Sequence, residues 1–297
     1  AAWGCGVPAT ADGATVPPPP EPPVPEEPST PPIFARDVPR LLPPNGAATG
    51  HAGVPGSSPV LRPLFRWRAP SAAGCAAPAF EIQVDDSCHP PDIPACSFPS
   101  PEAGATGLIA TGWRPDVPLR VAAEPPVGRR YFWRVRACCP DGCRSWSEAR
   151  YVDVGRVRDD FNGDGYGDIA ASAPGQPSAG GGHGAVYVFP GGPQGPRPTP
   201  SVSLRDPADA AGREFGTSLA SVDVDADGFA DLIVGVNSAA GAGHGPGVFV
   251  FRGSPAGLSA TPAPSGLDAP PGRRQDFGAQ VAAAGDVNGD GFGDIIA

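Results

Sequence analysis

Three aspartate-rich segments recur at a fixed interval in the second half of the chain, and this repeat constrains the fold more than any other feature. The segments align without gaps and begin at residues 160, 223 and 286, a period of 63 residues. A constant period of this size is typical of stacked supersecondary units. The second half is therefore predicted to consist of structural repeats.

The residue types in each segment predict a cation-binding loop. Oxygen ligands at positions 1, 3 and 5 converge when the chain turns sharply, and glycine at position 6 permits that turn. Position 7 would add its backbone carbonyl and position 9 a carboxylate, and such hard ligands suit calcium better than zinc or copper. The expected ligands are Asp160, Asn162, Asp164, Tyr166, Asp168, Asp223, Asp225, Asp227, Phe229, Asp231, Asp286, Asn288, Asp290, Phe292 and Asp294.

Two other interpretations of these segments are turns without a metal and the helical EF-hand. Several carboxylates within one turn repel each other unless a cation lies among them, which disfavours the empty turn. The EF-hand needs glutamate at position 12, where this chain has Ala171, Val234 and Ala297. It also needs flanking helices, whereas the residues after each loop are typical of strands.

The rest of each period also predicts strands. Segments 185–189 and 247–251 are rich in valine and aromatic residues, and each is followed by a turn that contains glycine. Each period is expected to hold about four short strands, and four-stranded units arranged radially make a β-propeller. With 42 glycines and 43 prolines in 297 residues, an all-β class is expected and a mostly helical one is excluded.

The second half, residues 155–297, closely resembles the FG-GAP repeats of integrin α-chains and their bacterial relatives. The resemblance rests on the three loops, on Phe215-Gly216 and Phe277-Gly278, and on segment 172–175. It implies calcium in a hairpin loop between two strands of each blade. Two departures are the missing Phe-Gly before the first loop and segment 235–237 in place of Gly-Ala-Pro. About two and a half blades are present, so the propeller is incomplete and we expect the natural protein to continue.

Residues 34–154 predict a separate antiparallel sandwich. Short alternating stretches at 64–68, 80–84, 131–137 and 149–154 indicate half-buried strands. Trp67, Tyr131 and Trp146-Ser147 resemble those of a fibronectin type III domain, although segment 87–119 is longer than that family normally carries. Trp67 and Trp133 are interpreted as core residues rather than as a surface site for sugar or protein.

Six of the seven cysteines lie between residues 75 and 143, which predicts a set of disulfides. The pairing stays open, except that neighbouring Cys138 and Cys139 do not bond to each other. The alternative is a zinc site that uses Cys138, Cys139, Cys143 and His89. Disulfides would place the protein in an oxidising, extracellular compartment.

Residues 1–33 are interpreted as a proline-rich disordered linker or tether. A small residue, Gly4, precedes Cys5, as in a bacterial lipoprotein, although Ala2 and Trp3 are unusual at their positions; Cys5 is thus a candidate lipid anchor of a secreted or lipoprotein type of protein. A free thiol in a disordered tail is the alternative, and an apolar signal core upstream would distinguish the two.

The net charge and the motifs of the chain argue against several classes of function. A net charge of −10 argues against nucleic-acid and anionic-membrane binders, and no apolar run is long enough to cross a bilayer. No catalytic motif is present, so an enzyme is not expected, and His183 and His244 are interpreted as turn residues rather than as ligands or bases. The predicted function is an extracellular calcium-binding module for binding or adhesion, with a cell-surface protein or glycan as partner. The alternative is an accessory propeller of a secreted hydrolase whose catalytic domain lies outside this segment.

Overall fold

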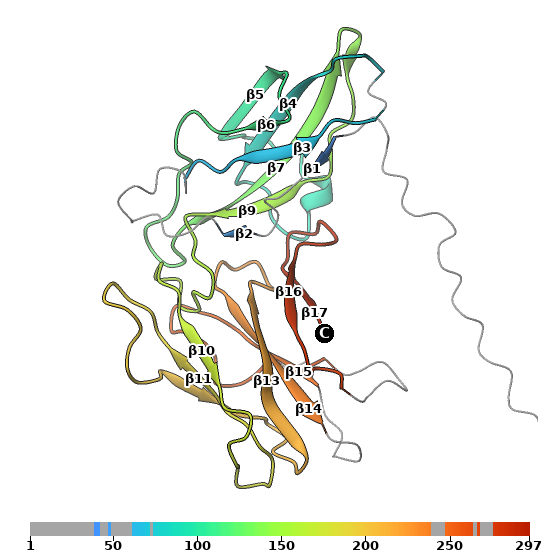
Figure 1. Cartoon of the computed structure of the whole chain (residues 1–297). Coiled ribbons are helices and arrows are strands. Elements are labelled where there is room, and N and C mark those ends of the chain that lie inside the picture. Colours follow the sequence, from blue (N-terminus) through green and yellow to red (C-terminus); the bar gives the residue numbers. More distant parts are fainter. Residues whose placement is uncertain are drawn as a thin grey trace, which may run out of the picture. The chain divides into compact units, whose positions relative to one another are not determined.

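The chain folds almost entirely into β-strands (Figure 1). The computed structural model describes residues 39–41, 47–48, 61–71, 74–238, 247–263, 266–267 and 276–297. Within these residues the helical structure is one 3-10 turn, η1 (Ile93–Ala95). The expected all-β class is thus confirmed. The predicted tether at 1–33, Cys5 and His244 lie outside the described residues, and all that is described belongs to one compact unit, Arg36–Ala297.

Two sheets form the region before the aspartate-rich loops. The smaller sheet has the order β1-β3-β6, with β1 (Arg40–Leu41), β3 (Phe65–Arg68) and β6 (Gly112–Trp113). The larger sheet has the order β2-β9-β7-β4-β5, with β8 paired to the end of β7. Its strands are β2 (Ala47–Ala48), β4 (Ala79–Asp85), β5 (Ala103–Leu108), β7 (Arg129–Cys139), β8 (Gly142–Cys143) and β9 (Arg150–Val154).

Both sheets contribute to one hydrophobic core. Alternation along β3 buries Phe65 and Trp67, and Trp133 of β7 packs against Phe65 with ring centroids 5.0 Å apart. Trp67 and Trp133 are 1% and 0% exposed, so the prediction that they are core residues is confirmed. The Tyr131 hydroxyl donates to the Arg120 carbonyl at 2.6 Å, a bond that sandwich domains of the immunoglobulin and fibronectin types commonly make. Assignment to the fibronectin type III family stays a prediction.

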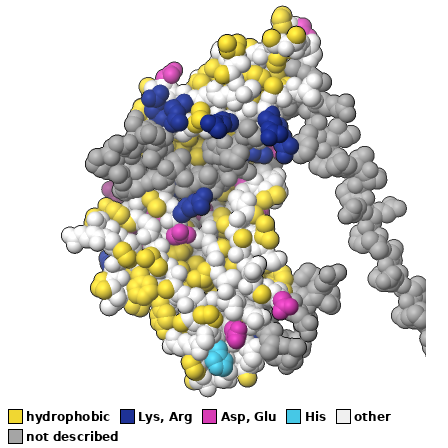
Figure 2. All heavy atoms as spheres, in the orientation of Figure 1, with side chains coloured by type: hydrophobic (Ala, Val, Ile, Leu, Met, Phe, Trp, Pro, Cys, Tyr) yellow, Lys and Arg dark blue, Asp and Glu magenta, His cyan; other side chains and the backbone are white. Residues whose placement is uncertain are grey.

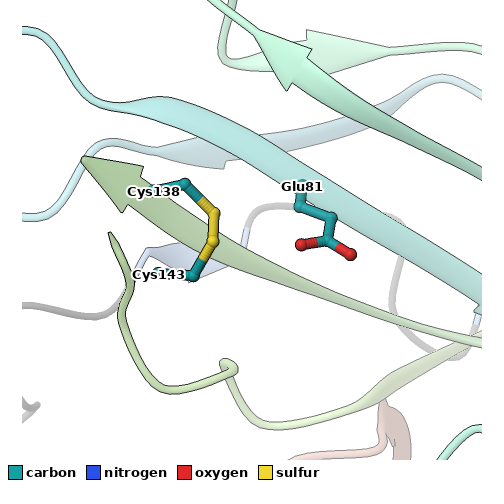
Figure 3. Close-up of side chains that lie close together, drawn as sticks. All are labelled: Glu81, Cys138 and Cys143. Atoms are coloured by element: carbon teal, nitrogen blue, oxygen red, sulfur yellow. A yellow bond between two sulfur atoms is a disulfide. The ribbon is translucent and has the colours of Figure 1, made fainter. Parts of the chain in front are cut away.

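The six clustered cysteines form three disulfides, Cys75–Cys139, Cys88–Cys96 and Cys138–Cys143. Neighbouring residues of a strand point to opposite faces, so Cys138 and Cys139 bond to different partners. Figure 3 shows Glu81 beside the Cys138–Cys143 bond, where the sulfur atoms are joined to each other and offer no thiolate to a metal. The disulfide prediction is confirmed, and the zinc alternative is wrong for the same reason.

The second region contains three antiparallel sheets in which the strands pair in chain order. The first holds β10 (Ile169–Ser172), β11 (Val186–Phe189) and β12 (Val202–Leu204). The second holds β13 (Arg213–Val222), β14 (Asp231–Ser238) and β15 (Val248–Phe251). The third pairs β16 (Ala282–Gly285) with β17 (Asp294–Ile296).

The strand count per period differs from the expected four. The second sheet has three strands plus an isolated bridge between Val248 and Leu267, which marks the place of a fourth. The first period lacks a counterpart of β13, because the strand before its loop is β9, which pairs with β7 in the larger sheet. This explains why no Phe-Gly pair precedes the first loop, since in the second period that pair belongs to β13. The number of propeller blades stays a prediction.

The Phe-Gly pair in β13 joins the first two sheets. Phe215 is fully buried in a core that also includes Val186 of the first sheet and Val234 of the second. Gly216 has a φ of 82°, and the register of β13 shifts between Phe215 and Ser218. Glycine adopts this left-handed conformation without strain. Phe215 thus places an aromatic ring in the core, and the adjacent Gly216 allows the β-bulge.

Candidate metal-binding loops

The three aspartate-rich segments lie in loops that end at the start of a strand. The second loop (residues 223–231) joins β13 to β14, where Val222 pairs with Asp231. The third loop (residues 286–294) joins β16 to β17, where Gly285 pairs with Asp294. The first loop (residues 160–168) joins β9 to β10, which lie in different sheets, so the second and third loops close hairpins and the first does not.

All three loops make the sharp turn that the sequence predicts. Glycine at position 6 has a φ of 90° at Gly165, 97° at Gly228 and 87° at Gly291. Its amide donates to the position 1 carboxylate in each loop, at 2.7, 3.0 and 3.1 Å. The left-handed glycine therefore turns the chain back over its own first aspartate.

The other aspartates also face the interior of their loops. The position 5 carboxylate accepts the position 7 amide at 2.9 Å in each loop, that is from Tyr166, Phe229 and Phe292. The position 9 carboxylate accepts the position 2 amide at 2.9, 2.9 and 2.6 Å. In each loop the carboxylates of positions 1, 5 and 9 therefore accept amides of the loop itself, and among the described residues of the three loops the structure gathers carboxylate oxygens from three positions only in the second loop, at Asp223, Asp225 and Asp231. A ligand role for the position 7 carbonyls stays a prediction.

The position 9 aspartates also bind a neighbouring strand end. Asp168 accepts the Gly191 amide at 2.7 Å, and Asp231 accepts the Gly253 amide at 2.8 Å. Gly191 follows β11 and Gly253 follows β15, and a Cβ there would overlap the carbonyl of Gly167 or Ala230, respectively. We call this the glycine latch. Sequence reasoning missed both glycines as functional residues, although their signal was the glycine turn after each aromatic strand.

The carboxylates of the second loop form the most ligand-like cluster. Asp223, Asp225 and Asp231 each offer an oxygen atom within 4.8 Å of the others. The Oδ1 atom of Asp223 is buried and has no hydrogen-bond partner. A buried oxygen without a partner is costly, and a cation shared with two more carboxylates would satisfy it. The residues of this loop therefore fit a calcium ion.

Position 3 differs between the loops. Asn162 of the first loop donates its amide to Asp164 at 2.9 Å, and Asn288 of the third donates to Asp290 at 2.8 Å. Asp225 of the second loop has no amide to donate and contacts Arg252 instead. The second loop therefore carries one more formal negative charge than either of the others.

Buried Arg130 and half-buried Arg156 approach the first aspartate of the second loop. Arg130 of β7 lies 3.1 Å from the Asp223 carboxylate and binds Asp153 through two bonds of 2.9 Å. Arg156 binds Asp153 at 2.8 Å and lies 3.7 Å from Asp223. Arg130 also donates to the Gly291 carbonyl of the third loop at 2.9 Å. These bonds connect two loops to the larger sheet through one side chain.

Burial changes the acidity of these carboxyls. Loss of solvation raises the pKa of Asp160 and Asp223 to about 6 and that of Asp231 to about 7, because burial disfavours the charged form. The pKa values of Asp168, Asp227 and Asp286 are raised for the same main reason. Burial also acts on Asp153, but the charges of Arg130 and Arg156 hold its pKa below the usual value. A bound divalent cation would supply the loops with the same kind of charge compensation.

His183 has a backbone role in the described structure. Its amide donates to Arg213 and its carbonyl accepts from Phe215, at 2.9 and 2.8 Å, which bridges the first sheet to β13. The side chain is exposed. The sequence predicts a turn residue at His183, whereas the structure places it in isolated β-bridges with Pro177 and Glu214.

Comparison with known proteins matches the region that contains the loops. An FG-GAP repeat family model matches residues 157–189 and 215–245. Integrin alpha-PS5 of Drosophila melanogaster is 37% identical over 153 residues, which make up 49% of this chain and 14% of that protein. Integrin alpha-IIb of Mus musculus is 44% identical over 98 residues, or 32% of this chain and 8% of that protein. The chain therefore carries FG-GAP repeats, is similar to integrin α-chains, and spans a small part of these relatives' length.

Proposed function

We propose that this chain is an extracellular calcium-binding module that acts in binding or adhesion. The observation that carries the proposal is the buried Oδ1 atom of Asp223, which has no partner and lies in a cluster with Asp225 and Asp231. Calcium would bind through the aspartates and asparagines of the loops and would brace each turn against its neighbouring strands. Its role here is structural, since it replaces the repulsion among carboxylates with attraction.

The disulfides support the extracellular location. Three disulfides among the described residues require an oxidising compartment to form and persist. The described residues contain no apolar helix of the length needed to cross a bilayer. Anchoring through Cys5, as in a lipoprotein, remains part of the proposal.

Similarity to integrin α-chains supports a role in adhesion. As a family, integrins are cell-surface adhesion proteins rather than enzymes, and the FG-GAP repeats are the region shared with them. We propose domains at residues 34–154 and 155–297, the first of the fibronectin type III kind and the second part of a propeller. A protein or glycan of a cell surface is the proposed partner. The comparisons do not favour the alternative of an accessory propeller for a hydrolase.

Thermal unfolding in calcium and in chelator tests the calcium site. We expect calcium to raise the Tm of the wild-type chain, because a ligand of the native state alone stabilises that state. The D223N variant should lose much of this increase. The D116N variant is the matched control, since Asp116 is exposed and lies outside the loops. Equal Tm values in calcium and in chelator for the wild-type chain would refute the proposal.

A further inference from the structure

The exposed face of the β1-β3-β6 sheet carries three arginines, Arg40, Arg66 and Arg68, which we call the arginine row. Strand β3 turns Phe65 and Trp67 into the core, so Arg66 and Arg68 point to the opposite face. Arg40 of β1 is exposed and lies directly opposite Arg68 in the pairing register. Figure 2 shows Lys and Arg side chains in a row across the surface where β3 lies in Figure 1, and in this chain all of them are arginines.

Arg66 and Arg68 of the arginine row are not neutralised by the residues that the structure describes. Like charges directly opposite each other in a sheet are destabilising, which is the relation between Arg40 and Arg68. Neither Arg66 nor Arg68 has a side-chain hydrogen bond or ion pair with any residue that the structure describes. Other arginines of the same region do pair with acids, as Arg129 and Arg136 do with Asp86 and Glu81. The chain has 31 acidic residues against 21 basic ones, yet none of the acidic residues that the structure describes pairs with Arg66 or Arg68.

The row offers charge without an apolar anchor. Both aromatic side chains of β3 are buried, and the residue opposite Arg66 is Gly112, which has no side chain to cover the guanidinium group. Tight protein partners generally insert an aromatic or aliphatic side chain into a pocket. A partner for this face must therefore bind mainly through repeated anionic groups.

The spacing of the row suits a narrow, linear polyanion. Side chains two positions apart on a strand are separated by roughly 7 Å, and directly opposed side chains by roughly 5 Å. A guanidinium group binds a sulfate or carboxylate through two parallel hydrogen bonds. Because the net charge of −10 would repel a polyanion that contacts a broad area, a single chain that follows one strand fits better than a duplex or a bilayer.

We propose that the arginine row binds a sulfated glycan chain. The proposal rests on the extracellular location in the proposed function, but it does not involve the calcium loops. It predicts binding that is reversible, independent of calcium and weakened by salt. Sulfate groups of the glycan would pair with Arg66 and Arg68, and Arg40 would add charge from β1.

Binding of heparin to the full chain, measured by calorimetry, tests this proposal. The variant R66Q/R68Q should bind at least about tenfold more weakly, because two charge-assisted contacts are removed. The matched control R197Q/R205Q removes the same charge from exposed arginines of the second region, and its affinity should change less than about twofold. Circular dichroism checks that each variant is folded.

The outcomes separate this site from the calcium loops and from other ligands. Support requires equal heparin binding by the wild-type chain in calcium and in chelator, and loss of binding in R66Q/R68Q. The proposal is overturned if the wild-type chain does not bind heparin, or if both double variants weaken binding equally. Equal affinity for desulfated heparin, for duplex DNA or for an acidic peptide would also overturn it, since the sulfated glycan would then not be the preferred ligand.

Discussion

The first and second aspartate-rich loops share a backbone but have different surroundings. In both, the first aspartate accepts the amide of a left-handed glycine, and the last aspartate closes a glycine latch. The second loop has a fourth aspartate and three nearby arginines, whereas no ion pair is described for the carboxylates of the first loop. Local sequence thus determines the shape of a loop, while distant residues determine how its charge is balanced.

Removal of Arg130 should have the largest effect on stability. The R130Q substitution would leave Asp153 and Asp223 buried with less compensation, and breaking a buried ion pair in this way costs about 3 to 5 kcal/mol. The neighbouring R129Q substitution removes an exposed ion pair and should cost at most about 1 kcal/mol. Denaturant unfolding measures both values. If the two variants were equally stable, the buried arginine would not be what distinguishes the second loop.

Calcium should stabilise the protein more at pH 7.5 than at pH 5. Asp223 and Asp231 have raised pKa values, of about 6 and about 7, whereas the pKa of aspartate in an unfolded chain is about 4. Without a cation the folded state therefore binds more protons than the unfolded state between these values, and its stability falls as the pH rises through this range.

Calcium must displace those protons in order to bind. Protonation of the two carboxyls at low pH therefore weakens calcium binding and the stabilisation that calcium provides. At a concentration of 100 times Kd, a bound ion adds about 2.7 kcal/mol. The measurement is the Tm in calcium minus the Tm in chelator at each pH. A difference that stayed constant between pH 5 and pH 7.5 would contradict the assignment of these two carboxyls as ligands.

The glycine latch should be equally important in the two loops. A Cβ at position 253 or 191 would overlap a backbone carbonyl, so G253A and G191A should each destabilise the protein by about 1 to 3 kcal/mol. Gly175 has nothing within 4 Å of an added Cβ, which makes G175A a suitable control. Chemical denaturation of the three variants provides the comparison. Stability of G253A similar to that of G175A would show that the latch is dispensable.

The smallest predicted change in stability concerns position 4 of the aspartate-rich loops. Ala226 has a φ of 61°, where the first and third loops have glycine at Gly163 and Gly289. The A226G substitution relieves this left-handed strain of about 1 to 2 kcal/mol but adds entropy to the unfolded chain. A net gain of about 0.5 kcal/mol in unfolding free energy is expected. A loss of stability would mean that the alanine side chain makes a contact worth more than the strain.

Features that depend on residues close together in the chain could be predicted from the sequence. The turn at Gly165, Gly228 and Gly291 follows from glycine at a fixed position after an aspartate, and the burial of Trp67 follows from alternation in β3. The latch to Gly253 and the approach of Arg130 to Asp223 connect residues far apart in the chain. Such contacts depend on how sheets pack, and no local pattern specifies them.

The pairing of the cysteines illustrates the same limit. Their clustering predicted disulfides, but the choice of Cys75–Cys139 and Cys138–Cys143 depends on which strand ends meet at the end of β7. Likewise, the first period was expected to form a regular unit. It does not, because β9 pairs with the larger sheet before the first loop begins.

Isothermal titration of calcium into the chelator-treated protein, with the heat of binding as the readout, tests most directly the claim that the aspartates form a calcium site. The wild-type chain should show saturable binding, and the double variant D223N/D225N should bind fewer ions, since it removes two of the three clustered carboxylates. The D116N control should match the wild type. Absence of saturable binding by a folded wild-type chain would contradict the claim that these aspartates form a calcium site.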